Sequence, residues 1–141
     1  VEGEVVVQTF SPVHPAIQFA RRHDFEGFFE AEIEFREQLR YPPFTRAALL
    51  TIRGRNEDKV KFSADHLKRE LEKLAGDLPE LIIAGPAPAP LLRAENFYRY
   101  QIMLRLGQMS ALSRRLAAIA AALTLPDDVT LTIDIDPVNL F

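Results

Sequence analysis

Three polar side chains that can hold an anionic ligand alternate along one short stretch of the sequence. Arg99, Gln101 and Arg105 fall on the same side of the run 98–106, because successive side chains of a strand point to opposite faces. Guanidinium groups bind phosphates, and the aromatic rings nearby can stack on bases. This face therefore predicts a site for single-stranded nucleic acid.

Two further arginines belong to the run that we expect to form the adjacent strand. Either Arg53 or Arg46 should lie beside the first three residues. The alternative is an ordinary solvated face, whose arginines pair across the sheet with Asp134 and Asp136.

Elsewhere the sequence shows no arrangement typical of an enzyme or a metal centre. The three histidines, His14, His23 and His66, are scattered without ligand spacing, and the chain has no cysteine. Asp134 and Asp136 share a strand face and could bind a cation, but strand-end acids in solvent or paired with arginine explain them more simply. Nucleotide-binding glycine motifs are also absent from the sequence, so we expect no catalytic residue, metal or cofactor in this chain.

The elements that would position these side chains follow one another in a recognisable order from residue 46 onward. Alternating or β-branched runs predict strands at 46–53, 81–84, 98–106 and 129–136. Apolar residues at helical spacing predict helices at 57–75, ended by Gly76, and at 109–123. Strand, helix, strand, strand, helix, strand is the split βαβ, ferredoxin-like pattern. We predict an α+β fold with an antiparallel sheet, the first and third strands central and both helices on one face.

The first 39 residues should place a strand and helices ahead of this core. The β-branched run 4–9 predicts a buried strand, and His14-Pro15 can open a short helix. Asp24 is a good N-cap for a helix that reaches Leu39, in which phenylalanines recur every three or four residues. We expect this aromatic stripe to face the core and the glutamates between to face solvent.

A proline-rich segment, Gly85-Pro-Ala-Pro-Ala-Pro90, joins the strand predicted at 81–84 to the strand predicted at 98–106. Its three spaced prolines predict a rigid connecting loop.

Composition limits the class of protein. The 141 residues, 48% of them hydrophobic, suit one domain with a true core. The absence of cysteine fits a reducing, cytoplasmic setting, and no apolar run approaches the roughly 20 residues of a membrane span. The start at Val1, without a basic segment, leads us to expect a fragment of a longer protein and no signal peptide. Because the net charge is −3, any site for a polyanion must be a local patch.

Three groups of motifs occur in order along almost the whole chain. They are the run 3–17, Gly-Glu-Val-Val-Val-Gln-Thr-Phe-Ser-Pro-Val-His-Pro-Ala-Ile; Asp24-Phe-Glu-Gly-Phe-Phe continuing to Tyr41-Pro-Pro-Phe44; and Gly85-Pro-Ala-Pro-Ala-Pro with Tyr98-Arg-Tyr-Gln101, closed by Asp134-Ile-Asp-Pro137. Together they resemble the C-terminal end of the PriA family, the primosomal replication-restart DNA helicases also called primosomal protein N′.

The resemblance implies a division of the chain into two parts. Residues 1–23 would be the end of the second helicase lobe and a connector, and residues 24–141 the C-terminal domain, a long acidic helix followed by the βαββαβ core. The parent protein would be an ATP-dependent 3′–5′ DNA helicase that uses ATP, magnesium and zinc. The ATPase motifs and zinc-binding cysteines of the family lie upstream, so the resemblance implies that this fragment is not an enzyme. Scaffold roles are implied for Tyr41-Pro-Pro-Phe44 and for Gly85, Pro86 and Pro88.

The resemblance also implies partners: single-stranded or forked DNA, the single-stranded DNA-binding protein and the helicase core of the same chain, with no membrane. DNA contact is implied for Arg99 and Gln101. Residues early in the last helix would receive the acidic tail of the protein partner; Gln108 lies there in a stretch poor in charge, so Arg114 and Arg115 are expected to complement it. The alternative is a structural or protein-interaction module without DNA binding of its own.

Overall fold

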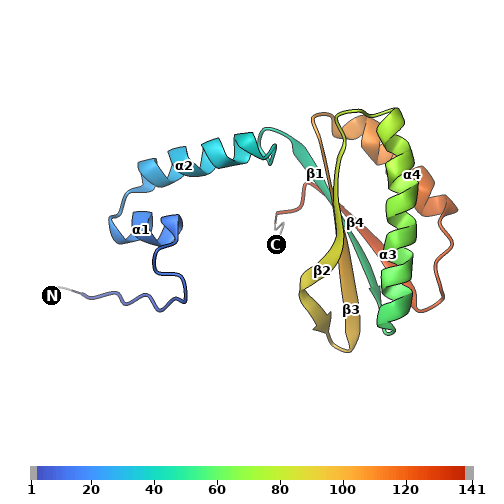
Figure 1. Cartoon of the computed structure of the whole chain (residues 1–141), viewed down its shortest axis with the longest axis horizontal. Helices are drawn as coiled ribbons and strands as arrows, with labels where there is room; N and C mark the ends of the chain where they lie inside the picture. Colours follow the sequence, from blue (N-terminus) through green and yellow to red (C-terminus); the bar gives the residue numbers. More distant parts are fainter. Residues whose placement is uncertain (1–2, 139–141) are drawn as a thin grey trace. The chain divides into compact units, whose positions relative to one another are not determined.

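The structure is a computed structural model that describes residues 3–138, and the chain divides into two units, Val1–Leu39 and Arg40–Phe141 (Figure 1). The domain boundary expected between residues 23 and 24 stays a prediction. No helix among residues 3–138 has the length and apolar character needed to cross a membrane.

The first unit contains two helices, α1 (Pro15–Arg21) and α2 (Phe25–Gln38). As predicted, Asp24 caps α2, because its carboxylate accepts a hydrogen bond from the Gly27 N–H at 2.9 Å. Phe19 of α1 meets Phe28 of α2 edge to face, with the ring centroids 6.3 Å apart. The two helices therefore pack together through aromatic side chains.

Two expectations for this unit are wrong. Residues 4–9 do not form a buried strand: Val5 is 90% exposed, and no described backbone pairs with this run to satisfy its hydrogen bonds. The aromatic stripe of α2 is buried only in part: Phe28 is half-buried against Phe19, but Phe25, Phe29 and Phe35 are each more than half exposed. Helical spacing brings such side chains to a helix surface, but no described element of this unit is placed to cover them.

The second unit contains a four-stranded antiparallel sheet and two helices. Its strands are β1 (Arg46–Gly54), β2 (Ile82–Ala94), β3 (Phe97–Leu106) and β4 (Val129–Ile135). They lie in the order β2-β3-β1-β4, so β1 and β3 are central. The helices are α3 (Glu57–Glu72) and α4 (Met109–Ala122); Gly76, expected to end α3 directly, instead closes a 3₁₀ turn at Lys73–Gly76. The α+β, split βαβ fold of this unit agrees with the sequence prediction.

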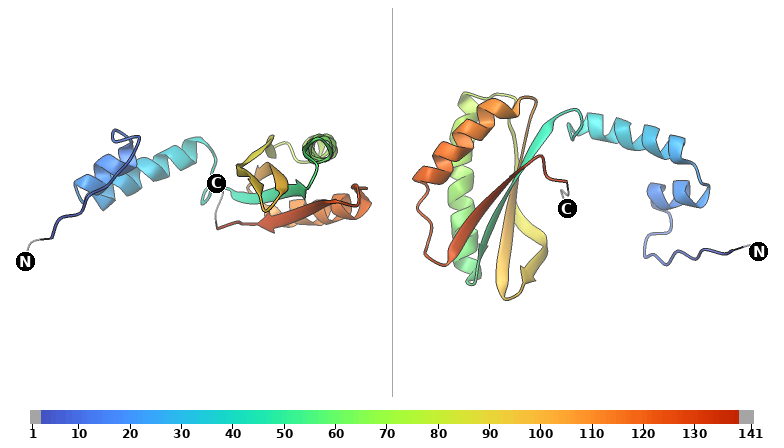
Figure 2. Two further views of the ribbon diagram at one scale, coloured as in Figure 1. Left: turned by 90° about the horizontal axis from the view of Figure 1, so that it is seen from below. Right: turned by 180° about the vertical axis from the view of Figure 1, so that it is seen from behind.

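Both helices cover the same face of the sheet (Figures 1 and 2). The core between the helices and the sheet is apolar and completely buried at its centre, in Leu50, Ile52, Leu67, Ile102, Leu104 and Leu112. Burial of each such side chain contributes about 1.5–3 kcal/mol relative to an exposed position. Strand alternation sends the residues between them to the opposite face, which we call the outer face.

The proline-rich segment is part of β2 and not a loop. Because proline has no N–H to donate, it is tolerated mainly at sheet edges, and β2 is an edge strand. Pairing of β2 with β3 shifts register between Ala84 and Ala87 and again between Pro88 and Arg93. The prolines therefore lie in an irregular edge strand, where they limit pairing with further strands.

Candidate nucleic-acid interface

The outer face is built by the odd-numbered residues of β1 and β3. Antiparallel pairing places Arg53 opposite Arg99, Thr51 opposite Gln101, and Ala47 opposite Arg105. Opposite residues of an antiparallel pair point to the same face. Four of the five predicted nucleic-acid contacts, Arg53, Arg99, Gln101 and Arg105, are thereby brought to one surface.

Arg53 and Arg99 are held at the turn end of β3. Arg99 donates two hydrogen bonds to the Leu91 carbonyl oxygen, at 3.1 Å from Nε and 2.6 Å from Nη2. Arg53 lies 3.9 Å from the exposed carboxylate of Glu95, and its guanidinium carbon lies 3.9 Å from the centroid of the Phe97 ring. The two guanidinium groups are thus oriented by contacts within the protein.

Phe97 is a residue that sequence reasoning missed. The guanidinium carbons of Arg53 and Arg55 lie 3.9 Å and 5.4 Å from the centroid of its ring, both within the range of cation–π attraction. At the same end of the sheet, Arg93 lies over the ring of Tyr98 at 5.4 Å. The sequence could have indicated this residue, because Phe97 immediately precedes the predicted strand and lies two residues before Arg99, so both side chains point to the same face.

Gln101 and Arg105 continue the same row along β3. The Gln101 amide donates a long hydrogen bond of 3.4 Å to the Thr51 hydroxyl. The Arg105 guanidinium lies 4.4 Å from the centroid of the Tyr41 ring. Arginine, amide and aromatic groups therefore alternate along the face, which is the chemistry expected of a single-strand binding surface.

Arg46 does not join this group. It lies at the other end of β1, opposite Leu106, and has an even number like the residues of β1 that face the core. Its guanidinium forms a bidentate ion pair with Asp136, which is the pairing that the alternative interpretation expected for an arginine of this sheet. The hydrogen bond from Arg46 lowers the pKa of the Asp136 carboxyl, and the same bond raises the pKa of Arg46.

The predicted protein-partner residues lie on α4, away from the outer face. Arg114 and Arg115 line a groove of about 520 Å³ whose floor is apolar, formed by Leu74, Leu78 and Ile119 with neighbouring alanines. Arg115 is held by Asp77 at 2.5 Å. Gln108 is the N-cap residue of α4, where its side chain makes no capping hydrogen bond, and it does not line the groove.

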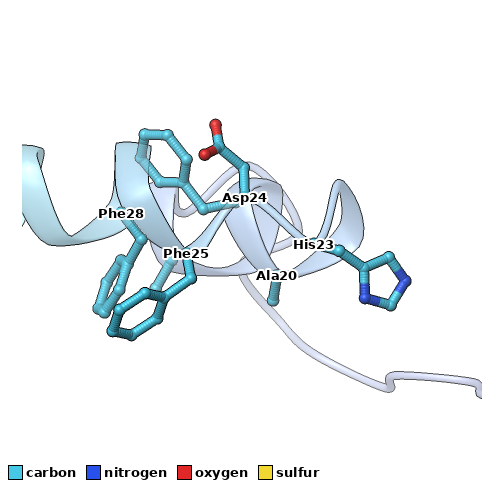
Figure 3. A pocket seen from close by; sticks show the side chains of 7 residues that line it. Ala20, His23, Asp24, Phe25 and Phe28 are labelled. Atoms are coloured by element: carbon cyan, nitrogen blue, oxygen red, sulfur yellow. The ribbon is translucent and has the colours of Figure 1, made fainter.

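A second hollow lies in the first unit, between α1 and α2. It measures about 420 Å³ and is lined mainly by aromatic side chains (Figure 3). Phe25 and Phe28 point to one side of the helix start, whereas the His23 imidazole points away from them. Across residues 3–138, no three acidic or histidine side chains come together in a way that could hold a metal ion. The aromatic hollow thus offers an apolar surface.

The fold defines an α+β domain of two helices on a four-stranded antiparallel sheet. A de novo designed protein, Foldit4, has the same fold at a TM-score of 0.51 and 10% identity, over 67% of this chain and 99% of the design. The family described as the primosomal protein N C-terminal domain matches residues 37–138. The chain belongs to this family.

The curated relatives are replication restart proteins named PriA. The protein from Synechocystis is 35% identical over 139 residues, and the match covers 98% of this chain and 16% of the relative. The Bacillus subtilis protein is 32% identical, and the match covers 83% of this chain and 14% of that protein. The Treponema pallidum protein is 30% identical, and the match covers 98% of this chain and 21% of that protein. The chain therefore spans about a sixth to a fifth of the length of these relatives.

Proposed function

We propose that this chain is the DNA- and protein-binding C-terminal module of a replication-restart helicase. It binds single-stranded or forked DNA through the outer face of its sheet. The observation that carries this proposal is the group at the turn end of the sheet, where Arg53 and Arg99 lie opposite each other beside the Phe97 ring.

The two kinds of side chain in this group serve two parts of a nucleic acid. Guanidinium groups neutralise phosphates and make affinity depend steeply on salt. An aromatic ring stacks on any base, so the binding tolerates sequence variation. Forked DNA carries unpaired strands next to duplex, and the outer face supplies contacts for the unpaired part.

The chemistry of the parent protein belongs to the larger part of that protein. The relatives are about five to six times as long as this chain, as expected if the ATPase, with its ATP, magnesium and zinc, lies outside these residues. The chain itself contributes binding and is not an enzyme. The exposed phenylalanines of α2, Phe25, Phe29 and Phe35, supply an apolar surface for the helicase core of the same polypeptide.

A titration of DNA by fluorescence anisotropy tests the proposal. The wild-type chain should bind forked and single-stranded DNA at low salt and lose affinity at moderate salt. The double variant Arg53→Ala/Arg99→Ala should bind at least tenfold more weakly. The matched control is Lys61→Ala/Arg69→Ala, which removes two exposed positive charges from α3. Equal binding by all three proteins would refute DNA recognition by the outer face.

The groove on α4 favours a second function beside the first. An apolar floor with Arg114 and Arg115 on its rim suits a peptide that combines carboxylates with an apolar side chain. The acidic tail that the resemblance implies for the single-stranded DNA-binding protein would supply the carboxylates. Binding of such a peptide without any binding of DNA would favour the alternative, a module devoted to protein interaction.

A further inference from the structure

The irregular pairing of β2 leaves a hollow on the outer face, next to the arginine row. The hollow measures about 260 Å³, and its walls include Tyr41, Leu49, Pro88, Pro90, Gln101 and Met103. It lies within the second unit and belongs to the same face as Arg99 and Arg105.

The sequence of β2 explains why space is left here. Between Ala84 and Ala87 the strand holds one residue more than β3 does between Met103 and Gln101, so the strand bulges. At the bulge the backbones come close together, because a Cβ on Gly85 would lie 2.7 Å from the Gln101 carbonyl oxygen. Small side chains then leave the surface beside β3 unfilled.

The chemistry of the hollow combines apolar walls with one amide and a charged rim. Tyr41, Met103 and the prolines offer flat or polarisable surface, while the Gln101 amide can both donate and accept hydrogen bonds. The Arg105 guanidinium, 4.4 Å from the centroid of the Tyr41 ring, adds positive charge next to this wall. The ligand that fits is therefore a flat, uncharged, hydrogen-bonding group attached to an anionic chain.

We infer that this hollow receives one unstacked base of single-stranded DNA while Arg99 and Arg105 hold the flanking phosphates. The inference rests on the proposed DNA-binding function. The hollow, at about 260 Å³, is large enough for part of a ligand, since sites that enclose a whole small molecule measure about 300–1,000 Å³. An apolar peptide side chain would fill the walls but would use neither the positive charge beside the hollow nor the polar atoms of the Gln101 amide.

Filling the hollow tests the inference. Ala84 lines the hollow and is exposed, so Ala84→Phe should occupy the space with little effect on folding. Ala87→Phe does the same from a second position, and Ala117→Phe on the exposed side of α4 is the matched control. Circular dichroism and thermal melts verify that all three variants are folded.

The probes are a single-stranded oligonucleotide and an abasic strand of equal length, both titrated against the full chain. The wild type should prefer the strand with bases by about 5- to 150-fold for each base that stacks, in the hollow or on Phe97, which corresponds to about 1–3 kcal/mol per base. The two hollow-filling variants should lose part of this preference and keep the salt dependence of the wild type, whereas Ala117→Phe should keep both.

Three results would overturn the inference in distinguishable ways. Unchanged preference in both filled variants would show that no base enters the hollow, while DNA binding by the outer face would stand. No binding of either strand by the wild type would refute the proposed function and the inference together. Protection of the hollow by an apolar peptide, with base preference unaffected, would assign it to a protein partner instead.

Discussion

Arg53 and Arg99 lie directly opposite each other on β1 and β3, so two positive charges face one another across the sheet. Like charges at such a pair destabilise a sheet by about 0.2–1 kcal/mol. The Glu95 carboxylate near Arg53 and the Leu91 carbonyl bound to Arg99 offset part of this repulsion. A phosphate bound between the two guanidinium groups would relieve the rest of this repulsion, as the proposed function expects.

Replacing either arginine by glutamine should separate binding from stability. Arg53→Gln or Arg99→Gln removes the repulsion, so the free energy of unfolding in urea should change by less than about 1 kcal/mol. Each variant should weaken binding of single-stranded DNA and reduce the slope of log affinity against log salt by about 0.7. Arg69→Gln on α3 should change neither quantity. A large loss of stability with an unchanged salt slope would assign the pair a structural role.

The Phe97 ring should contribute to affinity without changing the salt dependence. Phe97→Leu keeps an apolar side chain but loses the flat surface that stacks on a base, at a cost of about 1–3 kcal/mol in binding. Phe62, an exposed phenylalanine of α3, provides the control through Phe62→Leu. Anisotropy titrations at three salt concentrations measure both quantities. Equal affinities for the two variants would contradict a stacking role.

The core and the outer face were predictable because both depend on strand alternation. The run 98–106 alternates so regularly that Ile102 and Leu104 had to face opposite to Gln101 and Arg105. Register was not predictable, since it depends on which residues of two strands meet. Alternation places Arg46 on the core side of β1, but only the pairing in space sets Arg53 directly opposite Arg99.

The parts that sequence reasoning missed depend on neighbours that a local pattern does not reveal. Pro86, Pro88 and Pro90 predict a loop. At the edge of a sheet, however, one side of a strand needs no N–H donor, so the strand continues through the prolines. The phenylalanine spacing of α2 predicts a helix correctly, but whether Phe29 is buried depends on what packs against it.

The groove on α4 should discriminate peptides by charge. Arg114→Glu reverses a charge on the groove rim and should weaken binding of an acidic peptide with an apolar end by at least tenfold. DNA affinity should change little, because α4 packs on the opposite side of the sheet from the outer face. Isothermal titration calorimetry with Arg69→Glu as the control measures the effect. Equal peptide binding by both variants would remove the groove as the site.

The ion pair between Arg46 and Asp136 should make stability depend on acid pH. The hydrogen bond from Arg46 lowers the pKa of Asp136 in the folded chain. The pair therefore contributes above the ordinary aspartate pKa of about 3.9, and its contribution is lost as the pH falls through the lowered pKa. Asp136→Asn should reduce stability in urea at pH 7 and reduce it less at pH 3. A deficit of equal size at both pH values would contradict this linkage.

One substitution in the turn between β2 and β3, Glu95→Asn, should raise both the stability of the domain and its affinity for DNA. Glu95 and Asn96 form the two-residue connection with φ of 51° and 63°, as in the turns that favour asparagine and glycine. A left-handed backbone costs most L-residues about 1–2 kcal/mol, and asparagine tolerates it better than glutamate. Glu95→Asn should therefore raise the free energy of unfolding by a few tenths to about 1 kcal/mol.

The same substitution removes the carboxylate that lies 3.9 Å from Arg53, so more of the positive charge there is available to a phosphate. Glu95→Asn should bind single-stranded DNA more tightly than the wild type at low salt. Glu95→Gln separates the two effects, because it removes the charge but keeps a residue poorly suited to the turn. It should raise DNA affinity alone. If neither variant binds DNA more tightly, the Arg53 guanidinium does not contact the phosphate backbone.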